Sequence, residues 1–344
     1  MSGFGRHVLE LDAPAEIERI TARLRELLSA FRRKGFVVAL SGGIDSSVTA
    51  ALCVRAVGPE RVFGLHMPER DSSSETLELS RSVSTRFGFA SALEEISPTL
   101  EALGCYARRD QAIRGVIPEY GPGWKSKIVL PNLLEHTGYN YFSIVVESPE
   151  GTRTKKRLPL EAYLGIVAAT NFKQRVRKMM EYYHADRLNY AATGTPNRLE
   201  YDQGFFVKLG DGAADVKPIA HLYKSQVYAL GAALGVPETI LGRAPTTDTY
   251  SLAQGQDEFY FSLPYREMDL CLWAKNQGVP AAEVAEVLKL SVAQVERVFR
   301  DIDTKRATTR FLHLPPQLVV DVPEIVHTLS PPRRNDAAAD DSSG

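Results

Sequence analysis

The stretch FVVALSGGIDSS, residues 36–47, decides the fold of this chain. Its opening residues are apolar and predict a buried strand, which ends at Gly42 and Gly43. Residues 48–57 (VTAALCVRAV) then have the alanine, leucine and valine content of a helix packed against a sheet. A strand, a glycine turn and a helix N-terminus together form an anion site, because backbone N–H groups point at the ligand and the helix dipole favours negative charge.

The residues of this turn suit a phosphate group. Its two glycines let the backbone approach a phosphate without a Cβ in the way, and hydroxyl donors come from Ser41, Ser46 and Ser47. Asp45 is different, because a carboxylate repels a neighbouring phosphate unless a cation lies between the two. The presence of Asp45 in the turn therefore indicates Mg²⁺. The alternative is an ordinary strand–helix turn in which Asp45 caps the helix. The turn is neither a Walker loop nor a dinucleotide fingerprint, which need other residues at other spacings.

Composition excludes several classes of protein. The 344 residues could form one large α/β domain or two smaller ones, with 44% hydrophobic residues. A net charge of −1 and a pI of about 6.7 argue against a nucleic-acid partner. No apolar run reaches transmembrane length, and residues 1–14 lack the apolar core of a signal peptide. The cysteines Cys53, Cys105 and Cys271 are widely spaced, which argues against zinc and disulfide frameworks and predicts a cytoplasmic protein without a membrane partner.

Strands and helices alternate through the first hundred residues. Residues 14–34 predict an amphipathic helix, 61–68 a second strand, and 75–87 a helix after a serine-rich turn. This alternation predicts a doubly wound, mainly parallel sheet with ligands at the carboxyl ends of the strands. His66 is most simply a strand residue whose ring is satisfied, and we assign it no role.

The segment 105–160 has a different composition. Strand-like residues 127–130 and 141–146 are followed by a turn at 148–151 and a basic arm at 153–157. The pattern predicts a β-hairpin inserted between helices. The basic arm is most simply a solvated face of the hairpin; the alternative is a lid over a phosphorylated substrate.

A long helix is predicted for residues 160–184, followed by a strand at 188–192 and a loop at 193–200. The helix carries a basic stripe that we expect to be solvated: Lys173, Arg175, Arg177 and Lys178. Glu200, at the end of the loop, is either a surface residue at a helix start or a second Mg²⁺ ligand. The second interpretation follows because Mg²⁺ between phosphates usually takes one or two protein carboxylates.

The remaining chain predicts mainly helices. Residues 204–215 are glycine-rich and acidic, but their oxygen-bearing side chains do not follow the spacing of a calcium loop. Helices are predicted at 224–234 and 265–275, and two short helices at 281–300 have the outline of a helix-turn-helix. Acidic residues on that pair favour a packing role over DNA binding. The tail from 330 to 344 has the composition of a disordered terminus.

From about residue 36 to 315 the chain resembles NAD synthetase, the ATP-dependent enzyme that converts deamido-NAD to NAD, within the N-type ATP pyrophosphatases. Residues 41–46 resemble its pyrophosphate loop, and Met67-Pro68 its second ATP loop. Other matching residues follow in the family's order: Asn171 with Arg175, Gly194-Thr195 with Glu200, 204–208 with Asp211 and Asp215, Lys224, Pro245-Thr246, Asp257-Glu258 and Lys305-Arg306. The resemblance implies an adenine nucleotide alpha-hydrolase-like fold in one domain, residues 1–329, with an insertion at about 105–160 and a helical C-terminal part at about 265–315.

The resemblance also implies roles for individual residues. The residues implied to bind ATP are Ala39, Leu40, Ser41, Gly42, Gly43, Ile44, Asp45, Ser46, Ser47, Met67, Thr195, Lys224 and Thr246. Those implied to bind deamido-NAD are Asn171, Arg175, Lys208, Asp211, Asp215 and Lys305. Asp45 and Glu200 would hold Mg²⁺, and Lys224, Thr246 and Asp45 would be catalytic. The family forms a homodimer with the dinucleotide across the interface.

Some residues depart from the family pattern. Val207 replaces a Thr, Thr304 replaces a His, and the segment 105–160 is a few dozen residues longer. The residues that resemble the family's ATP site are intact, whereas those that resemble its site for the carboxylate substrate are altered. The alternative is therefore an amide ligase that acts on a different carboxylate. No cysteine precedes the glycine turn, and we therefore expect free ammonia, or ammonia from a separate glutaminase, as the nitrogen source. A tRNA-modifying enzyme would need a cysteine pair and a basic face, and a nucleotide sensor would not need both carboxylates.

Overall fold

The computed structural model describes residues 3–130, 141–245, 250–252, 255, 260–261 and 263–325. The chain forms two units, Met1–His313 and Leu314–Gly344. In the second unit, the described residues 314–325 contain no helix or strand. The predicted disordered tail at 330–344 lies outside the described residues. All helices and strands below belong to the first unit.

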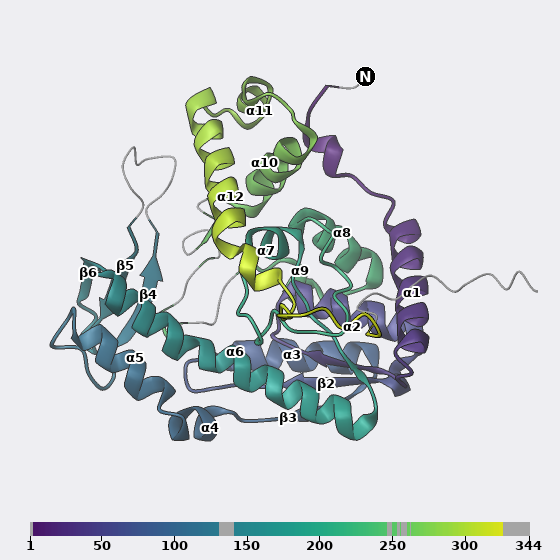
Figure 1. Cartoon of the computed structure of the whole chain (residues 1–344), viewed down its shortest axis with the longest axis horizontal. Coiled ribbons are helices and arrows are strands. Elements are labelled where there is room, and N and C mark those ends of the chain that lie inside the picture. Colours follow the sequence, from purple (N-terminus) through teal and green to yellow (C-terminus); the bar gives the residue numbers. More distant parts are fainter. Residues whose placement is uncertain are drawn as a thin grey trace, which may run out of the picture. The chain divides into compact units, whose positions relative to one another are not determined.

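The first unit contains a parallel sheet of four strands in the order β3-β2-β1-β7. Figure 1 labels two of these strands, β2 and β3. Ala39 at the end of β1 pairs with Leu65 of β2, and Phe36 at its start pairs with Ala191 of β7. The strands are β1 (Phe36–Ala39), β2 (Val62–His66), β3 (Ala90–Leu93) and β7 (Ala191–Ala192). This arrangement confirms the predicted doubly wound parallel sheet.

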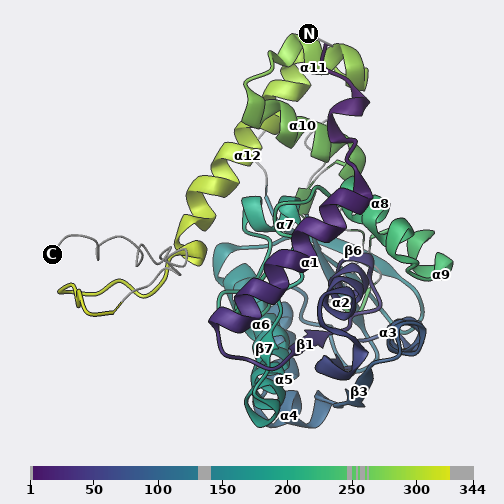
Figure 2. The ribbon, with the colours of Figure 1, turned by 90° about the vertical axis from the view of Figure 1, so that its right-hand side faces the viewer.

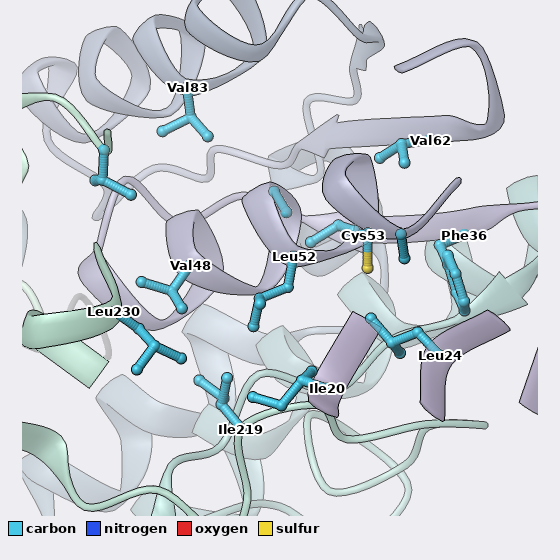
Figure 3. Packing of buried hydrophobic residues seen from close by; sticks show 14 of the residues in the cluster. Ile20, Leu24, Phe36, Val48, Leu52, Cys53, Val62, Val83, Ile219 and Leu230 are labelled. Carbon is cyan, nitrogen blue, oxygen red and sulfur yellow. The ribbon is translucent and has the colours of Figure 1, made fainter. Parts of the chain in front are cut away.

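Helices cover both faces of the sheet. The apolar side chains of β1 point alternately to one face and to the other, so both faces need a covering layer. Phe36 and Val38 pack with the helices α1, α2 and α8, whereas Val37 packs with α5 and α6 on the other face. Figure 2 shows α1 beside α2, and Figure 3 shows side chains of both helices around Phe36. The helices on the first face are α1 (Ala13–Ala30), α2 (Ile44–Val57) and α8 (Lys224–Leu234). The other elements of this part are η1 (Arg6–Leu9), η2 (Pro59–Arg61), α3 (Ser74–Phe87), α4 (Ser97–Ala102) and α9 (Glu238–Leu241).

The helix α6 (Leu160–Leu188) is longer than predicted. It continues through Leu188, which the sequence analysis placed in a strand, so β7 keeps only two residues. Asn189 ends the helix with φ of 56°, in the left-handed region that asparagine tolerates, and its N–H donates to the carbonyl of Ala185. The prediction of a strand from residue 188 was therefore wrong in its first half.

The segment 105–160 contains more than the predicted hairpin. The strands β5 (Ser143–Glu147) and β6 (Arg153–Arg157) form that hairpin, and β4 (Lys125–Val129) pairs with β5 to complete an antiparallel sheet of three. The segment begins with the helix α5 (Cys105–Arg114), which packs against α6. The side chains of the basic arm are mostly exposed, as expected for a solvated face.

Three C-terminal helices form a core of their own, which Figure 1 shows beyond one end of the sheet. They are α10 (Tyr265–Gln277), α11 (Ala281–Leu288) and α12 (Val292–His313). The apolar faces of α11 and α12 pack into this core, in agreement with the packing role, although α12 is much longer than the predicted short helix. Leu199 from α7 (Arg198–Gln203) joins the same core, and this fixes the helix that carries Glu200. Within the described ranges, no helix combines the length and the apolarity needed to cross a membrane.

Candidate functional site

A cavity of about 1390 Å³ lies at the carboxyl ends of β1, β2 and β7. Most residues implied to bind ATP line it: Ala39, Leu40, Ser41, Gly42, Gly43, Ile44, Asp45, Ser46, Met67, Thr195 and Lys224. Glu200 lines it as well, and so do Asn171, Arg175, Lys208, Asp211 and Lys305 of the substrate set. Ser47 is fully buried and is not among the lining residues, and Thr246 lies outside the described residues. The chain thus brings most of the predicted site together in one place.

Asp215 is the predicted substrate residue that the structure places elsewhere. Its carboxylate accepts hydrogen bonds from the backbone N–H of Ala192, at 2.8 Å, and from the hydroxyl of Tyr182, at 3.3 Å. Asp215 therefore holds the end of β7 and does not line the cavity. Asp257-Glu258, which matched the family pattern, lie outside the described residues.

The glycine turn has the backbone geometry of an anion cradle. Gly42 has φ of 72°, and a Cβ built on it would lie 2.6 Å from the carbonyl oxygen of Thr76. The helix α2 begins at Ile44, four residues earlier than predicted, so Asp45 lies in its first turn. Gly43 at the N-cap has no side chain that could occupy the first N–H groups of the helix, and these groups remain for a ligand.

Serine hydroxyls stabilise the turn itself. The hydroxyls of Ser46 and Ser47 donate to the carbonyl of Gly43, at 3.0 and 2.8 Å. The hydroxyl of Ser41 accepts from the N–H of Gly43 at 3.3 Å. The expectation that all three serines offer hydroxyl donors to a phosphate is therefore corrected: in this structure Ser46 and Ser47 bind the backbone of the turn.

A Gly42→Ala variant should lose about 1–3 kcal/mol of unfolding free energy, because alanine is strained at this φ and its Cβ meets a backbone carbonyl. Denaturant unfolding measures the loss. Gly43→Ala is the matched control, since Gly43 has φ of −90° and its added Cβ would make only an ordinary contact of 3.4 Å. Equal losses in the two variants would show that the conformation of Gly42 is not required.

Asp45 and Glu200 lie in the same cavity and are joined by Asn197. The side-chain amide of Asn197 donates to Asp45 Oδ1 at 3.0 Å. Asn197 is also the N-cap of α7: its Oδ1 accepts from the N–H of Glu200, and Glu200 Oε2 accepts from the N–H of Asn197, both at 3.2 Å. Asn197 is not among the predicted site residues, although Asn followed three residues later by Glu is the pattern of a capping box.

An Asn197→Ala variant should lose about 1 kcal/mol of stability with the cap of α7, and activity should fall by roughly tenfold or more as the two carboxylates lose their common partner. Asn197→Ser separates the two effects, because serine caps a helix but cannot reach Asp45 in the same way. We expect this variant to keep its unfolding midpoint and to lose activity. A serine variant with wild-type activity would mean that the bond to Asp45 has no role in the site.

Lys224 is the cation that pairs with Asp45. Its side chain is 2% exposed, and its Nζ forms an ion pair with Asp45 Oδ2. Burial disfavours the charged ammonium, but the carboxylates of Asp45 and Glu200 outweigh burial and raise the pKa of Lys224 above its usual value. Lys224 therefore stays charged at neutral pH.

The N-terminus of α8, where Lys224 lies, is held by a buried carboxylate from α10. Asp269 accepts from the N–H of Lys224 at 3.1 Å, and from the N–H and hydroxyl of Ser225, both at 2.7 Å. Burial raises the pKa of Asp269 to about 6. The C-terminal helices thus position Lys224, and no sequence pattern connects two residues so far apart in the chain.

The basic stripe of α6 is not wholly solvated, which corrects the prediction. Lys173 is buried and its Nζ lies 2.8 Å from both Glu69 and Asp71. Arg109 of α5 adds a contact of 2.6 Å to Asp71. Burial opposes ionisation of Asp71, but Lys173 and Arg109 lower its pKa. This network fixes the loop after β2 against α5 and α6. Lys178, also buried, pairs with Glu181 at 2.6 Å.

Two of the lysines predicted to bind substrate line the cavity and donate to backbone carbonyls. Lys208 donates to the carbonyl of Phe311 at 2.8 Å, and Lys305 to that of Tyr260 at 2.6 Å. Lys305 also pairs with Asp301 at 2.6 Å. Asp211 accepts from the N–H of Val207 at 2.7 Å, and burial raises the pKa of its carboxyl.

The carboxylates of Asp45 and Glu200 fit a magnesium ion that arrives with a nucleotide. Among the described residues, no group of three or more histidine, cysteine or acidic side chains could hold a metal by itself. Mg²⁺ commonly takes one or two protein carboxylates and completes its shell with phosphate oxygens and water. Two carboxylates beside an anion cradle match that donor set, whereas a permanent metal site would need more protein ligands.

With a parallel sheet, helices on both of its faces, the glycine turn and the cavity above it, the chain has the adenine nucleotide alpha-hydrolase-like fold. The chain belongs to the NAD synthase family, whose family model matches residues 16–116 and 132–309. The break between the two matched ranges falls inside the segment 105–160, where the sequence analysis expected additional residues.

Relatives and solved structures agree with this assignment. The NH(3)-dependent NAD(+) synthetase of Rhizobium meliloti is 63% identical over 322 residues, covering 94% of this chain and 96% of the relative. The NH(3)-dependent NAD(+) synthetase of Thermotoga neapolitana is 34% identical over 291 residues, covering 83% of this chain and 94% of the relative. The structure of the NH3-dependent NAD synthetase from Campylobacter jejuni has a TM-score of 0.60 at 21% sequence identity. The match covers 90% of this chain and 100% of that one, and it shows that the two chains share a fold. The chain is thus a member of a family of ligases that form carbon–nitrogen bonds, and this membership implies ATP as a co-substrate.

Proposed function

We propose that the chain converts deamido-NAD, ATP and ammonia to NAD, AMP and pyrophosphate, with Mg²⁺ held by Asp45 and Glu200. One observation carries the proposal: both carboxylates and Lys224 lie in the same cavity as the glycine turn. The names of the relatives support ammonia as the nitrogen source and NAD as the product.

Amide formation needs the carboxylate oxygen of the substrate to become part of a leaving group. The carboxylate attacks the α-phosphorus of ATP, the bond to the bridging oxygen breaks, and pyrophosphate leaves. The N–H groups of the glycine turn and the ammonium of Lys224 stabilise the negative charge that develops on the phosphates. Bound Mg²⁺ would supply further neutralisation of that charge.

The second step uses the acyl-adenylate. Ammonia attacks its acyl carbon, the bond to the phosphate oxygen breaks, AMP leaves, and the nitrogen loses a proton to give the amide. Lys224 stays charged through both steps, because the nearby carboxylates raise its pKa. Thr246 remains a proposed participant in the second step. We also propose a homodimer, which sedimentation equilibrium would detect as twice the chain mass.

A substrate screen tests this function. The protein is incubated with ATP, Mg²⁺ and ammonium, and release of AMP is measured with deamido-NAD and with other carboxylates, including nicotinic acid mononucleotide. We expect AMP and NAD in equal amounts with deamido-NAD, and little AMP when glutamine replaces ammonium. AMP release that requires a different carboxylate would favour the alternative, a related amide ligase with another acceptor. No AMP with any carboxylate would overturn the proposal.

A further inference from the structure

His66 lies at the carboxyl end of β2 and lines the cavity, although its side chain is only 3% exposed. The expectation of a satisfied ring is half right. Nδ1 lies 2.8 Å from the hydroxyl oxygen of Ser80. Nε2 is screened from solvent and, within the part of the chain that the structure describes, has no hydrogen-bond partner. A buried polar atom without a partner is costly, and an absent ligand that supplies the partner removes that cost.

The contacts of Ser80 determine which ring nitrogen carries the hydrogen. The hydroxyl of Ser80 donates its single hydrogen to the carbonyl of Leu77 at 2.9 Å. Both bonds of the Ser80 oxygen form together when it accepts from His66, and this pattern assigns the ring hydrogen to Nδ1. Burial, and to a lesser degree the charge of Arg81, lower the pKa of His66, so the ring is neutral at pH 7. Nε2 then presents a lone pair, and its missing partner is a hydrogen-bond donor.

The position of His66 indicates which part of a nucleotide would supply that donor. The glycine turn that receives the phosphates follows β1, the strand between β2 and β7. The residues proposed for the acceptor substrate, Lys208 and Asp211, follow β7 in the chain and line the cavity. The β2 side therefore remains for the base. Apolar side chains that line the cavity near this strand suit the faces of a purine ring: Leu40, Met67 and Leu77.

We propose that Nε2 of His66 accepts a hydrogen bond from the exocyclic amino group of adenine and thereby selects ATP over purine nucleotides that lack this group. The inference rests on the proposed use of ATP. A 6-oxo purine would bring a carbonyl oxygen against the lone pair of Nε2, so that two acceptors would face each other. A purine with hydrogen at this position would leave Nε2 without a partner, and sites built to bind a donor discriminate strongly against such analogues.

The test compares kcat/KM for three nucleotides: ATP, ITP and purine riboside triphosphate. With the wild-type protein we expect a preference for ATP of roughly 10- to 100-fold over purine riboside triphosphate, and a larger one over ITP. In His66→Leu the kcat/KM for ATP divided by that for purine riboside triphosphate should fall towards one, mainly because kcat/KM for ATP decreases. Ser80→Ala removes the acceptor that holds the ring hydrogen on Nδ1, so the hydrogen can move to Nε2. This variant should lower the same ratio partly. His221→Leu is the control, because exposed His221 pairs with Glu16 and does not line the cavity.

Two results would overturn the inference: a wild-type protein that uses purine riboside triphosphate as well as ATP, or a folded His66→Leu variant with an unchanged ratio. If that variant fails to fold, as circular dichroism would show, the wild-type comparison and Ser80→Ala still decide. A wild-type protein that cleaves none of the three nucleotides would contradict the proposed function as well, whereas ATP turnover without selectivity would contradict the role of His66 alone.

Discussion

A Lys224→Ala variant should release pyrophosphate roughly 10²- to 10³-fold more slowly than the wild type, a loss on the order of 3–4 kcal/mol of transition-state stabilisation. Lys224 is the buried group, charged at neutral pH, that pairs with Asp45 beside the glycine turn. The charge on the phosphates grows as the bond between the α-phosphorus and the bridging oxygen breaks, so kcat should fall more than the affinity for ATP. Single-turnover release of pyrophosphate measures the effect.

The control for this variant is Lys275→Ala. Lys275 also forms an ion pair, at 2.7 Å from Asp303, but it does not line the cavity. We expect its pyrophosphate release to match the wild type. Lys224→Met keeps most of the side-chain volume and should be as slow as the alanine variant. Undiminished pyrophosphate release in a folded Lys224 variant would contradict the proposed role.

The second large effect concerns the two carboxylates. Asp45→Asn and Glu200→Gln should each lower activity by roughly 10²-fold or more and raise the Mg²⁺ concentration needed for half of the remaining activity. Because both residues would hold one ion, the double variant should lose little more than either single variant. Activity measured against Mg²⁺ concentration provides the data.

Glu296→Gln serves as the control, since Glu296 is an exposed carboxylate on α12. Its Mg²⁺ dependence should equal that of the wild type. Losses in the two single variants that add fully in the double variant, with no change in Mg²⁺ dependence, would mean that Asp45 and Glu200 act separately and do not share an ion.

The features that sequence could predict are the local ones. The strand, the glycines and the helix of residues 36–57 are adjacent in the chain, and the structure contains them in that order. Features that depend on distant partners could not be predicted. The burial of Lys173 depends on Glu69 and Asp71, about a hundred residues earlier, and Asp269 reaches α8 from a different helix. Without those partners in view, a basic stripe is most simply interpreted as solvated.

Three further features were not predicted, each for a different reason. Asn197 could have been predicted from the capping pattern that it forms with Glu200, because the signal is local. The end of α6 was harder to predict, since Leu188 suits a helix or a strand and the left-handed turn at Asn189 is the only local sign of the boundary. His66 was dismissed because a histidine in a strand usually has both ring nitrogens bonded or solvated, and the bond to Ser80 that leaves Nε2 as an acceptor becomes visible only in the packed structure.

The measurement that tests the adenylation most directly is the fate of oxygen from the substrate carboxylate. Deamido-NAD labelled with ¹⁸O in its carboxylate is converted with ATP, Mg²⁺ and ammonium, and the products are analysed by ³¹P NMR and mass spectrometry. Attack on the α-phosphorus predicts one ¹⁸O atom in the phosphate of AMP for each NAD formed, and none in pyrophosphate. Formation of ADP with ¹⁸O in inorganic phosphate would place the cleavage at the γ-phosphorus and contradict the account.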